Sequence, residues 1–509
     1  MMLTKNCSFA YIVCFLLLTN ITICPIATAG PGSDPMGLDV IEVDYEKKNW
    51  KFGDPFKFYD DKLQFDFELR QKFEWRDNTV DFTDKSDIRD DAGLLSRVRL
   101  GLKWIATEEL TFYSQLQDSR TLFDDPEGIV DNREFSKNDS PIDLRQAWVK
   151  WDMQQDIPFT LTFGRQVWKY GDSRLLGEDD WGNNSNTFDS VKLRYHADDY
   201  WVEFFSGWIV RHITDSFNEP DTEDLITGLW SHTDIIPKVD SNFYAIFRSK
   251  SDVDTKTVLK NVDKQSSGNV APAGDYLTLG TFIKSKKGEW DNWDFEAELN
   301  LQVGEISNPL QTSSTLKKVV VNTSRQDHLA FASHIEAGYK LEKEYKTRVY
   351  VEYNYASGDD DPGDDINHSF QNLHPSNHYK DGRYGIMDRF AWSNIHNLGF
   401  GIQTKPLKNF SVKLSHQLYW LDSTNSPWTG SDLKPVGDKD RFGKALQKNV
   451  SHFVGNELNL VMKYKPKKWF SVEVGYAHFF AGDYVYDTDP IDKGVDDADF
   501  LYLKTTLAF

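Results

Sequence analysis

The feature that most constrains the fold of this chain is a strict alternation of apolar and polar residues. In residues 63–76 every odd position is apolar except Gln71, and every even position is polar or charged. A helix would scatter these residues over all its faces, so the pattern predicts a β-strand with one wet and one apolar face. The segment is long for a strand of a soluble protein and has the length of a tilted strand that crosses a bilayer.

The pattern recurs along the whole chain and predicts eighteen strands, although in 142–152 and 200–210 it does not assign the two faces. The last of them, 499–509, places Phe509, Leu507 and Leu503 on one face and Lys504 on the other. We expect this terminal strand to pair with 63–76, because a closed barrel leaves no strand edge exposed. The segments between these two are 93–105, 109–119, 142–152, 158–167, 187–196, 200–210, 224–232, 239–249, 275–284, 292–304, 329–341, 346–356, 391–404, 409–421, 451–465 and 468–480.

The gaps between these segments alternate in length. Every gap that follows an odd-numbered segment, from 77–92 to 481–498, is longer than every gap that follows an even-numbered segment, from 106–108 to 466–467. A sandwich or a soluble barrel has no reason to sort its loops by side, whereas an outer-membrane barrel has short periplasmic turns and long external loops. The sequence therefore predicts an all-β fold, a transmembrane antiparallel β-barrel of eighteen strands in the bacterial outer membrane.

The amino terminus has the pattern of a secretory signal peptide. Lys5 is the only charge in residues 1–29, an apolar run follows it, and Ala27-Thr28-Ala29 offers a small-residue cleavage site. All three cysteines lie in this segment, so the expected mature chain has no disulfide and no thiolate metal site. We expect a cleaved signal peptide at 1–29, an irregular periplasmic lead-in at 30–62 and the barrel at 63–509.

Charged residues fall on the wet faces of the predicted strands. A charge on the lipid face would cost about 2–4 kcal/mol near the bilayer midplane, so these side chains are expected to face the lumen. They indicate either a channel that attracts an anionic solute or a ladder of cross-strand ion pairs that holds a wet barrel together, and we favour the channel for the group. The basic ones include Arg70, Lys72, Arg97, Arg99, Lys103, Lys192, Arg194, Arg348, Lys413 and Lys463, and the acidic ones Asp66, Glu68, Glu296, Glu298, Glu352, Glu457 and Glu473.

Acidic residues also crowd the long gaps. The formal net charge of −21 argues against non-specific binding of nucleic acid. The stretches 358–365 and 487–497 have the oxygen ligands that Ca²⁺ prefers, but neither has the spacing of a calcium loop, so solvated external loops are the favoured interpretation. No other cofactor is expected, and no catalytic motif indicates an enzyme. His334, His416 and His478 are interpreted as structural residues rather than ligands.

Several stretches resemble the alginate export family of outer-membrane proteins. The most specific lies within 164–189 and contains Tyr170-Gly171-Asp172-Ser173-Arg174-Leu175-Leu176-Gly177. The resemblance implies a monomeric eighteen-stranded barrel whose arginine-rich lumen passes an anionic polysaccharide and is narrowed by inward-folded loops. It also implies constriction residues at Arg97, Arg99, Arg145, Arg165 and Arg174. The other similar stretches are 97–104, 112–120, 143–148, 374–379, 475–483 and 496–500.

The favoured hypothesis is a passive outer-membrane channel for an anionic oligo- or polysaccharide such as alginate. The alternatives are a general or hydrophobic-solute porin of the same fold and a secreted β-rich carbohydrate-active enzyme. Expected partners are outer-membrane lipid, the anionic saccharide and the barrel-assembly machinery, which would recognise the terminal Phe509. The pore-lining candidates are Arg70, Arg97, Arg99, Lys103, Arg145, Arg165, Arg174, Arg194 and Arg348.

Overall fold

A computed structural model gives the fold of the chain, which divides into two units, Met1–Lys51 and Phe52–Phe509. The predicted signal peptide and most of the predicted lead-in lie outside the residues that the structure describes, so both stay predictions. The described residues are 56–79, 82, 90–124, 140–155, 157–213, 216–251, 273–307, 311–313, 318–320, 325–342, 344–376, 383–426, 428–430, 449–489 and 494–509.

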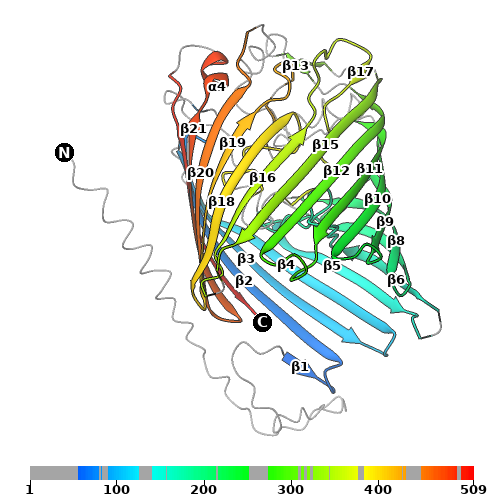
Figure 1. The fold of residues 1–509 in the computed structure, drawn as a ribbon. Helices are drawn as coiled ribbons and strands as arrows, with labels where there is room; N and C mark the ends of the chain where they lie inside the picture. Colours follow the sequence, from blue (N-terminus) through cyan, green and yellow to red (C-terminus); the bar gives the residue numbers. More distant parts are fainter. Residues whose placement is uncertain are drawn as a thin grey trace. The chain divides into compact units, whose positions relative to one another are not determined.

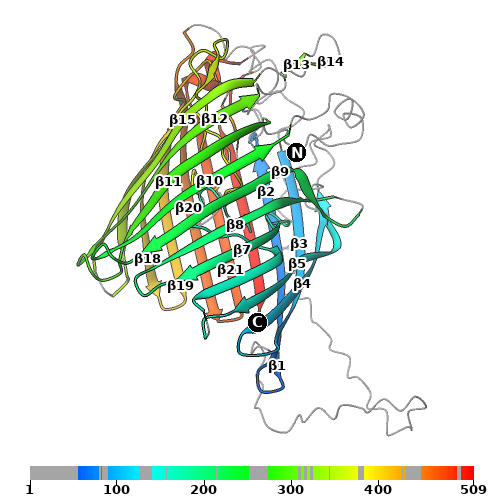
Figure 2. The same cartoon turned by 90° about the vertical axis from the view of Figure 1, so that its right-hand side faces the viewer.

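Eighteen antiparallel strands close into a barrel (Figures 1 and 2), which confirms the predicted fold class. Each strand pairs with its neighbours in chain order, and β22 pairs with β2 to close the circle. The strands are β2 (Leu63–Asp77), β3 (Asp90–Ile105), β4 (Leu110–Asp124), β5 (Ser140–Asp152), β6 (Phe159–Gln166), β7 (Phe188–His196), β8 (Tyr200–Arg211), β9 (Glu219–Thr233), β10 (Val239–Lys250), β11 (Gly274–Ser285), β12 (Trp293–Ser307), β15 (Arg325–Lys340), β16 (Arg348–Ala356), β18 (Ile395–Leu407), β19 (Phe410–Trp420), β20 (Phe453–Lys467), β21 (Phe470–Ala481) and β22 (Ala498–Ala508).

A few short elements accompany the barrel strands. β1 (Phe56–Phe58) lies within the stretch predicted as lead-in and pairs with the start of β2. β17 (Ile366–Asn367) runs parallel to β15, and β13 (Gln311–Ser313) pairs with β14 (Lys318–Val320). The one-turn helix α4 (Asp483–Asp487) follows β21. Among the described residues no helix is both long enough and apolar enough to cross a membrane.

The two faces of each strand differ as the alternation predicts. On β3, Leu100 and Trp104 are 53% and 50% exposed on the outer surface, whereas Arg97 and Arg99 on the opposite face are buried. Successive side chains of a strand point to opposite faces, so the apolar set lies outside the barrel and the charged set inside. An apolar outer band with a polar interior is the arrangement of a transmembrane β-barrel.

The closing seam joins the two ends of the predicted strand series. β22 pairs with β2 from Glu68 opposite Ala508 to Asp77 opposite Asp499. Lys504 of β22 lies on the lumen face, where its Nζ is 2.7 Å from Glu473 Oε1. The pairing of the first and last predicted strands is therefore confirmed.

The hydrophobic core of the barrel lies inside it rather than in its wall. Rings from the segment between β6 and β7, including Trp168, pack on wall residues such as Phe188, with 4.0 Å between these two ring centroids. A second group around Phe390 and Trp428 comes from later loops, with 5.0 Å between those ring centroids. These inward-folded segments position the candidate site.

Candidate functional site in the barrel lumen

The segment between β6 and β7, residues 167–187, crosses the lumen, and we call it the lumen loop. At one side of the barrel, Arg70 of β2 donates to the main-chain oxygens of Asp180 and Gly182 at 2.5 Å each. At the other side, Arg174 of the loop lies 3.6 Å from Glu298 of β12. In the strand order β2 and β12 are nearly opposite. The lumen loop is therefore attached to both walls of the barrel.

Arg97 of β3 is one of the buried attachments of the lumen loop. Its Nε and Nη2 lie 2.9 and 2.6 Å from Glu68 Oε1, and its Nη1 lies 3.0 Å from Asp180 Oδ1 of the loop. The Arg97 side chain is 1% exposed, whereas Asp180 is 42% exposed. Although burial raises the pKa of Asp180, the guanidinium groups of Arg97 and Arg99 hold it well below its usual value. The loop carboxylate therefore stays ionised against the wall.

Two further arginines complete this attachment. Arg99 Nη2 lies 2.8 Å from Asp180 Oδ1 and 3.1 Å from Ser185 Oγ. Arg145 of β5 donates to Glu178 and, at 2.9 Å, to Ser185 Oγ. Both arginines are buried. The guanidinium N–H groups of both arginines thus bond to other groups of the protein, so we infer that these side chains position the loop.

A second segment, between β17 and β18, packs on the lumen loop. Leu176 and His374 form a parallel bridge, and Gly177 N–H donates to His374 C=O at 2.8 Å. Arg383 of the second segment donates to Asp172 Oδ2 of the lumen loop at 2.7 Å. A Cβ on Gly177 would lie 2.9 Å from the Ser376 backbone nitrogen, so this close approach requires glycine.

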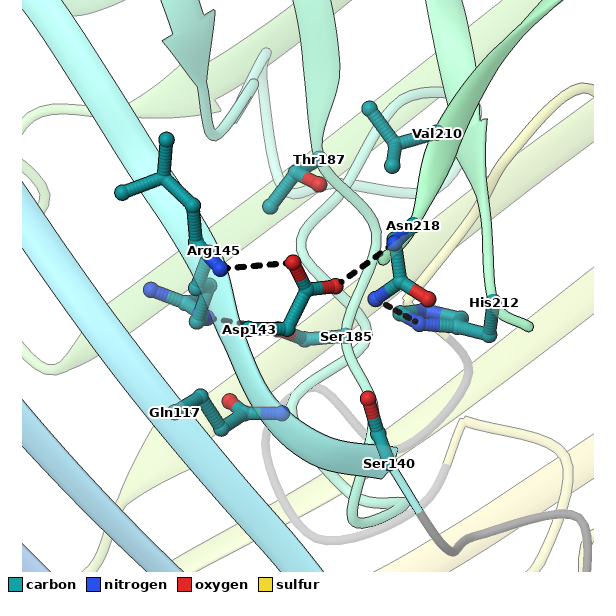
Figure 3. Close-up of a pocket in the computed structure, with 10 residues that line it drawn as sticks. Gln117, Ser140, Asp143, Arg145, Ser185, Thr187, Val210, His212 and Asn218 are labelled. Atoms are coloured by element: carbon teal, nitrogen blue, oxygen red, sulfur yellow. Dashed lines mark hydrogen bonds between the residues drawn. The ribbon is translucent and has the colours of Figure 1, made fainter. Parts of the chain in front are cut away.

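A small hollow lies where the lumen loop meets β5 and β8 (Figure 3). Asp143 Oδ2 accepts a hydrogen bond from Asn218 N–H at 3.0 Å, and Asn218 Nδ2 lies 3.1 Å from His212 Nδ1. These polar groups satisfy one another, so the hollow is a junction between the lumen loop and the wall.

Basic side chains line the lumen at the end where short turns join the strands. In several ion pairs there the cation is exposed and its carboxylate is buried. The exposed fractions are 44% for Lys463 against 3% for Glu473, and 33% for Arg194 against 5% for Glu203. We call the inward-facing basic residues at this end the basic collar, and Arg348 is the member whose carboxylate partner is the more exposed, 14% against 26% for Asp294. The basic collar comprises Lys103, Lys150, Lys192, Arg194, Lys284, Lys340, Arg348, Lys413, Lys463 and Lys504.

The structure separates the predicted pore-lining candidates into groups. Arg70, Arg97, Arg99 and Arg145 meet at one side of the lumen loop, and Arg174 lies at the other side. The remaining inward-facing candidates, Lys103, Arg194 and Arg348, belong to the basic collar.

Arg165 lies apart from the other candidates. Arg165 lies two residues after Phe163 on β6, so the two side chains share one face of the strand. Phe163 is 66% exposed, which makes this the outer face. Its Nε and Nη2 lie 2.7 and 3.0 Å from Asp189 of β7, and its Nη1 donates to Asn218 C=O at 3.2 Å. Arg165 therefore joins neighbouring wall elements.

Sequence reasoning missed several residues of the site. Asp180 and Glu178 fall in a long gap without periodicity, so nothing local indicated that they turn inward. Lys284 and Lys340 occupy inward positions near the ends of β11 and β15, where each is 43% exposed. Extending the alternation to the last residue of each strand would have identified these two lysines.

Comparisons with known proteins agree with this architecture. The family model described as alginate export matches residues 61–494, and a search of curated proteins returned no match. The fold is similar to that of the outer membrane protein OpdK from Pseudomonas aeruginosa, with a TM-score of 0.53 and 11% identity over 88% of this chain and 98% of that chain. It is also similar to OccD3 (OpdP) from Pseudomonas aeruginosa, with a TM-score of 0.52 and 10% identity over 90% and 93% of the two chains. OccAB4 from Acinetobacter baumannii gives a TM-score of 0.51 and 11% identity over 88% and 98%.

Proposed function

Because this chain belongs to the alginate export family, we propose that it passes an anionic oligo- or polysaccharide, such as alginate, by passive diffusion. Its family and fold are those of porin-like channels of the outer membrane. The proposal concerns the chemical class of the solute and the residues that select it.

The basic collar is the observation that carries this proposal. At the lysines whose carboxylate partner is buried, a solute in the lumen would meet the ammonium group before the carboxylate. Lys463 is 44% exposed and Glu473 only 3%, and Lys284 is 43% exposed and Glu296 6%. Rings of charge of one sign select ions in other channels, and a narrow low-dielectric passage strengthens their field. The collar therefore favours a polyanion although the whole chain is acidic.

The buried arginines have a different part in this proposal. Arg97 and Arg99 hold the lumen loop against β3, and Arg145 holds it against β5, so these arginines define the width of the passage. The collar lysines, which hold exposed charges, would contact the solute. Selectivity and passage width would then depend on different residues.

Ion selectivity in planar bilayers tests the proposal. We expect the wild-type channel to prefer anions. In the double variant Lys340→Gln, Lys463→Gln we expect the anion-to-cation permeability ratio, measured from the reversal potential in a salt gradient, to fall severalfold. Block of the current by uronic-acid oligomers should need a correspondingly higher concentration in the variant. Lys286→Gln is the matched control, because Lys286 follows the last residue of β11 and pairs with Asp234 on a turn.

Two outcomes would contradict the proposal. One is a wild-type channel that prefers cations, and the other is an anion preference that the double variant keeps unchanged. Block by neutral oligosaccharides as strong as block by uronic-acid oligomers would favour a general porin of the same fold.

A further inference from the structure

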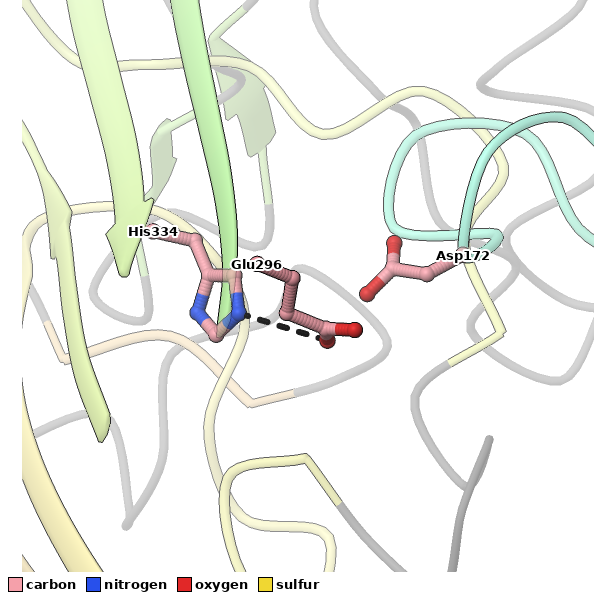
Figure 4. Close-up of side chains that lie close together, drawn as sticks. All are labelled: Asp172, Glu296 and His334. Atoms are coloured by element: carbon pink, nitrogen blue, oxygen red, sulfur yellow. Dashed lines mark ion pairs between the residues drawn. The ribbon is translucent and has the colours of Figure 1, made fainter. Parts of the chain in front are cut away.

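A buried group of three side chains connects the lumen loop to the barrel wall. Asp172 of the loop, Glu296 of β12 and His334 of β15 each direct one ligand atom inward, and these atoms all lie within 4.8 Å of one another (Figure 4). The side chains of Asp172, Glu296 and His334 are 3%, 6% and 0% exposed. The group lies beside the passage and takes no part in the selectivity proposed above.

The hydrogen bonds around His334 fix the tautomer of its neutral ring. Its Nδ1 lies 2.7 Å from Asn354 Oδ1, which also accepts from Arg174 Nη1 at 3.0 Å. The amide nitrogen of Asn354 donates to Asn397 Oδ1 at 2.8 Å, so Asn354 Oδ1 is an acceptor and His334 Nδ1 must donate. A neutral His334 then carries its lone pair on Nε2, which is the atom that points into the group.

The atoms that converge here lack a donor among them. Within the part of the chain that the structure describes, His334 Nε2 and Asp172 Oδ1 are buried and make no hydrogen bond. Nε2 lies 3.6 Å from Glu296 Oε1, which is longer than a hydrogen bond. Three buried atoms that each present a lone pair to the others are unfavourable unless a cation lies between them.

The formal charges around the group balance. The carboxylates of Asp172, Glu296 and Glu298 face two buried guanidinium groups, those of Arg174 and Arg383. Lys284 pairs with Glu296 at 2.9 Å, but it is 43% exposed, so water screens much of its charge. With Lys284 the three carboxylates face three cations, so the metal site is indicated by the geometry of the ligand atoms and not by net charge.

We propose that Asp172, Glu296 and His334 bind a divalent transition-metal ion of the zinc class, which fixes the lumen loop to the wall. The 3.6 Å between His334 Nε2 and Glu296 Oε1 is close to the separation of roughly 3.4 Å between two ligands that lie about 2.1 Å from a tetrahedral Zn²⁺. An imidazole nitrogen with carboxylate oxygens suits zinc better than Mg²⁺ or Ca²⁺. Asn354 would orient the His334 ring, as outer-sphere partners do in zinc proteins.

Metal analysis of the purified barrel tests this site. The protein is treated with a chelator, loaded with Zn²⁺, desalted and analysed for bound zinc by mass spectrometry. We expect about one zinc ion per wild-type chain and loss of that ion in His334→Gln. His232→Gln is the matched control, because His232 belongs to a second, more exposed group with Asp234 and Asp240. This variant should keep the buried ion.

A second variant and measurement keep the test valid if His334→Gln does not fold. Asp172→Asn changes a residue of the lumen loop and leaves the strands intact, and Co²⁺ bound in place of zinc reports its ligands by visible absorption. We expect an absorption band in the wild type that Asp172→Asn shifts or loses. No bound metal in the wild type, or equal zinc in wild type and both buried-site variants, would overturn the proposal. Neither measurement depends on which solute the channel passes.

Discussion

Arg97 shows how a buried charge can serve the shape of a passage. It is 1% exposed between Glu68, which is 22% exposed, and Asp180 of the lumen loop. Removing one partner of a fully buried ion pair costs about 3–5 kcal/mol, and since both carboxylates here are partly exposed we expect about 1–3 kcal/mol for Arg97→Gln. Unfolding of the barrel in urea measures this loss of stability.

Arg120→Gln is the control for that prediction. Arg120 lies on β4, is 50% exposed and pairs with Asp118, so we expect a change below about 0.5 kcal/mol. Arg97→Gln should also raise the noise of the channel current, because it frees one attachment of the lumen loop. Equal stability of the two variants would contradict the positioning role of Arg97.

From the sequence, the face of the strand on which a wall residue lies could be predicted better than the residues that its side chain contacts. Parity is a local property, so Arg97 and Arg99 were placed in the lumen correctly, whereas their partner Asp180 depends on the path of a distant loop. For Arg165 the family resemblance suggested a pore residue. The alternation through Phe163 would have placed it on the outer face, where the structure has it.

Among the elements, the lumen loop is the one whose attachment should respond to pH. Burial, together with the charge of Asp180, raises the pKa of Asp179 in this loop from 3.8 to about 7. The folded loop then keeps a proton that the detached loop would lose, so the contribution of Asp179 to attachment is largest below about pH 4. We expect it to weaken as the pH rises from about 4 to 7 and to stay constant above that.

Asp179→Asn should remove this dependence, because an amide does not titrate in this range. Limited proteolysis of the loop and current noise, both recorded from pH 4 to 8, measure the attachment. Asp361→Asn, on an exposed acidic loop, is the control and should leave the pH profile unchanged. A wild-type profile that is flat, or that strengthens toward pH 7, would contradict the predicted direction.

All eighteen barrel strands were predicted from alternation, because a strand with one lipid face and one wet face carries that pattern in its own residues. The predicted ends of the strands were less accurate where hydrogen bonding to the neighbouring strand, rather than the apolar-polar alternation, determines where a strand ends. The predicted 224–232 became β9 (Glu219–Thr233), and 391–404 became β18 (Ile395–Leu407). The family resemblance implied inward-folded loops, but the lumen loop and β17 lie in gaps without periodicity, so the residue pattern could not show which loops fold inward.

At the scale of the whole molecule, the charge of a region can differ in sign from the net charge of the chain. The net charge is −21, yet in four ion pairs at the short-turn end of the lumen the lysine is more exposed than its carboxylate partner. Buried carboxylates such as Glu473 neutralise the wall without reaching the passage. An acidic chain can therefore present a basic interior, and composition alone says little about what such a barrel attracts.

Closure of the barrel also depends on its last residue. Phe509 N–H donates to Phe67 C=O at 3.0 Å, and Phe67 N–H donates to Phe509 C=O at 2.8 Å. The Phe509 ring lies 5.3 Å from the Phe67 ring and 5.7 Å from the Phe56 ring, measured between centroids. Deleting Phe509 removes these contacts at the seam, together with the terminal aromatic that we expect the barrel-assembly machinery to recognise.

We therefore expect deletion of Phe509 to lower the yield of folded barrel in the outer membrane severalfold, because the seam would lose both hydrogen bonds and an apolar contact. The heat-modifiable band of the membrane fraction measures this yield. Phe509→Tyr keeps the ring and the main chain and should assemble like the wild type. If the deletion and Phe509→Tyr gave the same yield as the wild type, neither closure nor recognition would depend on this residue, and the channel proposal would stand without it.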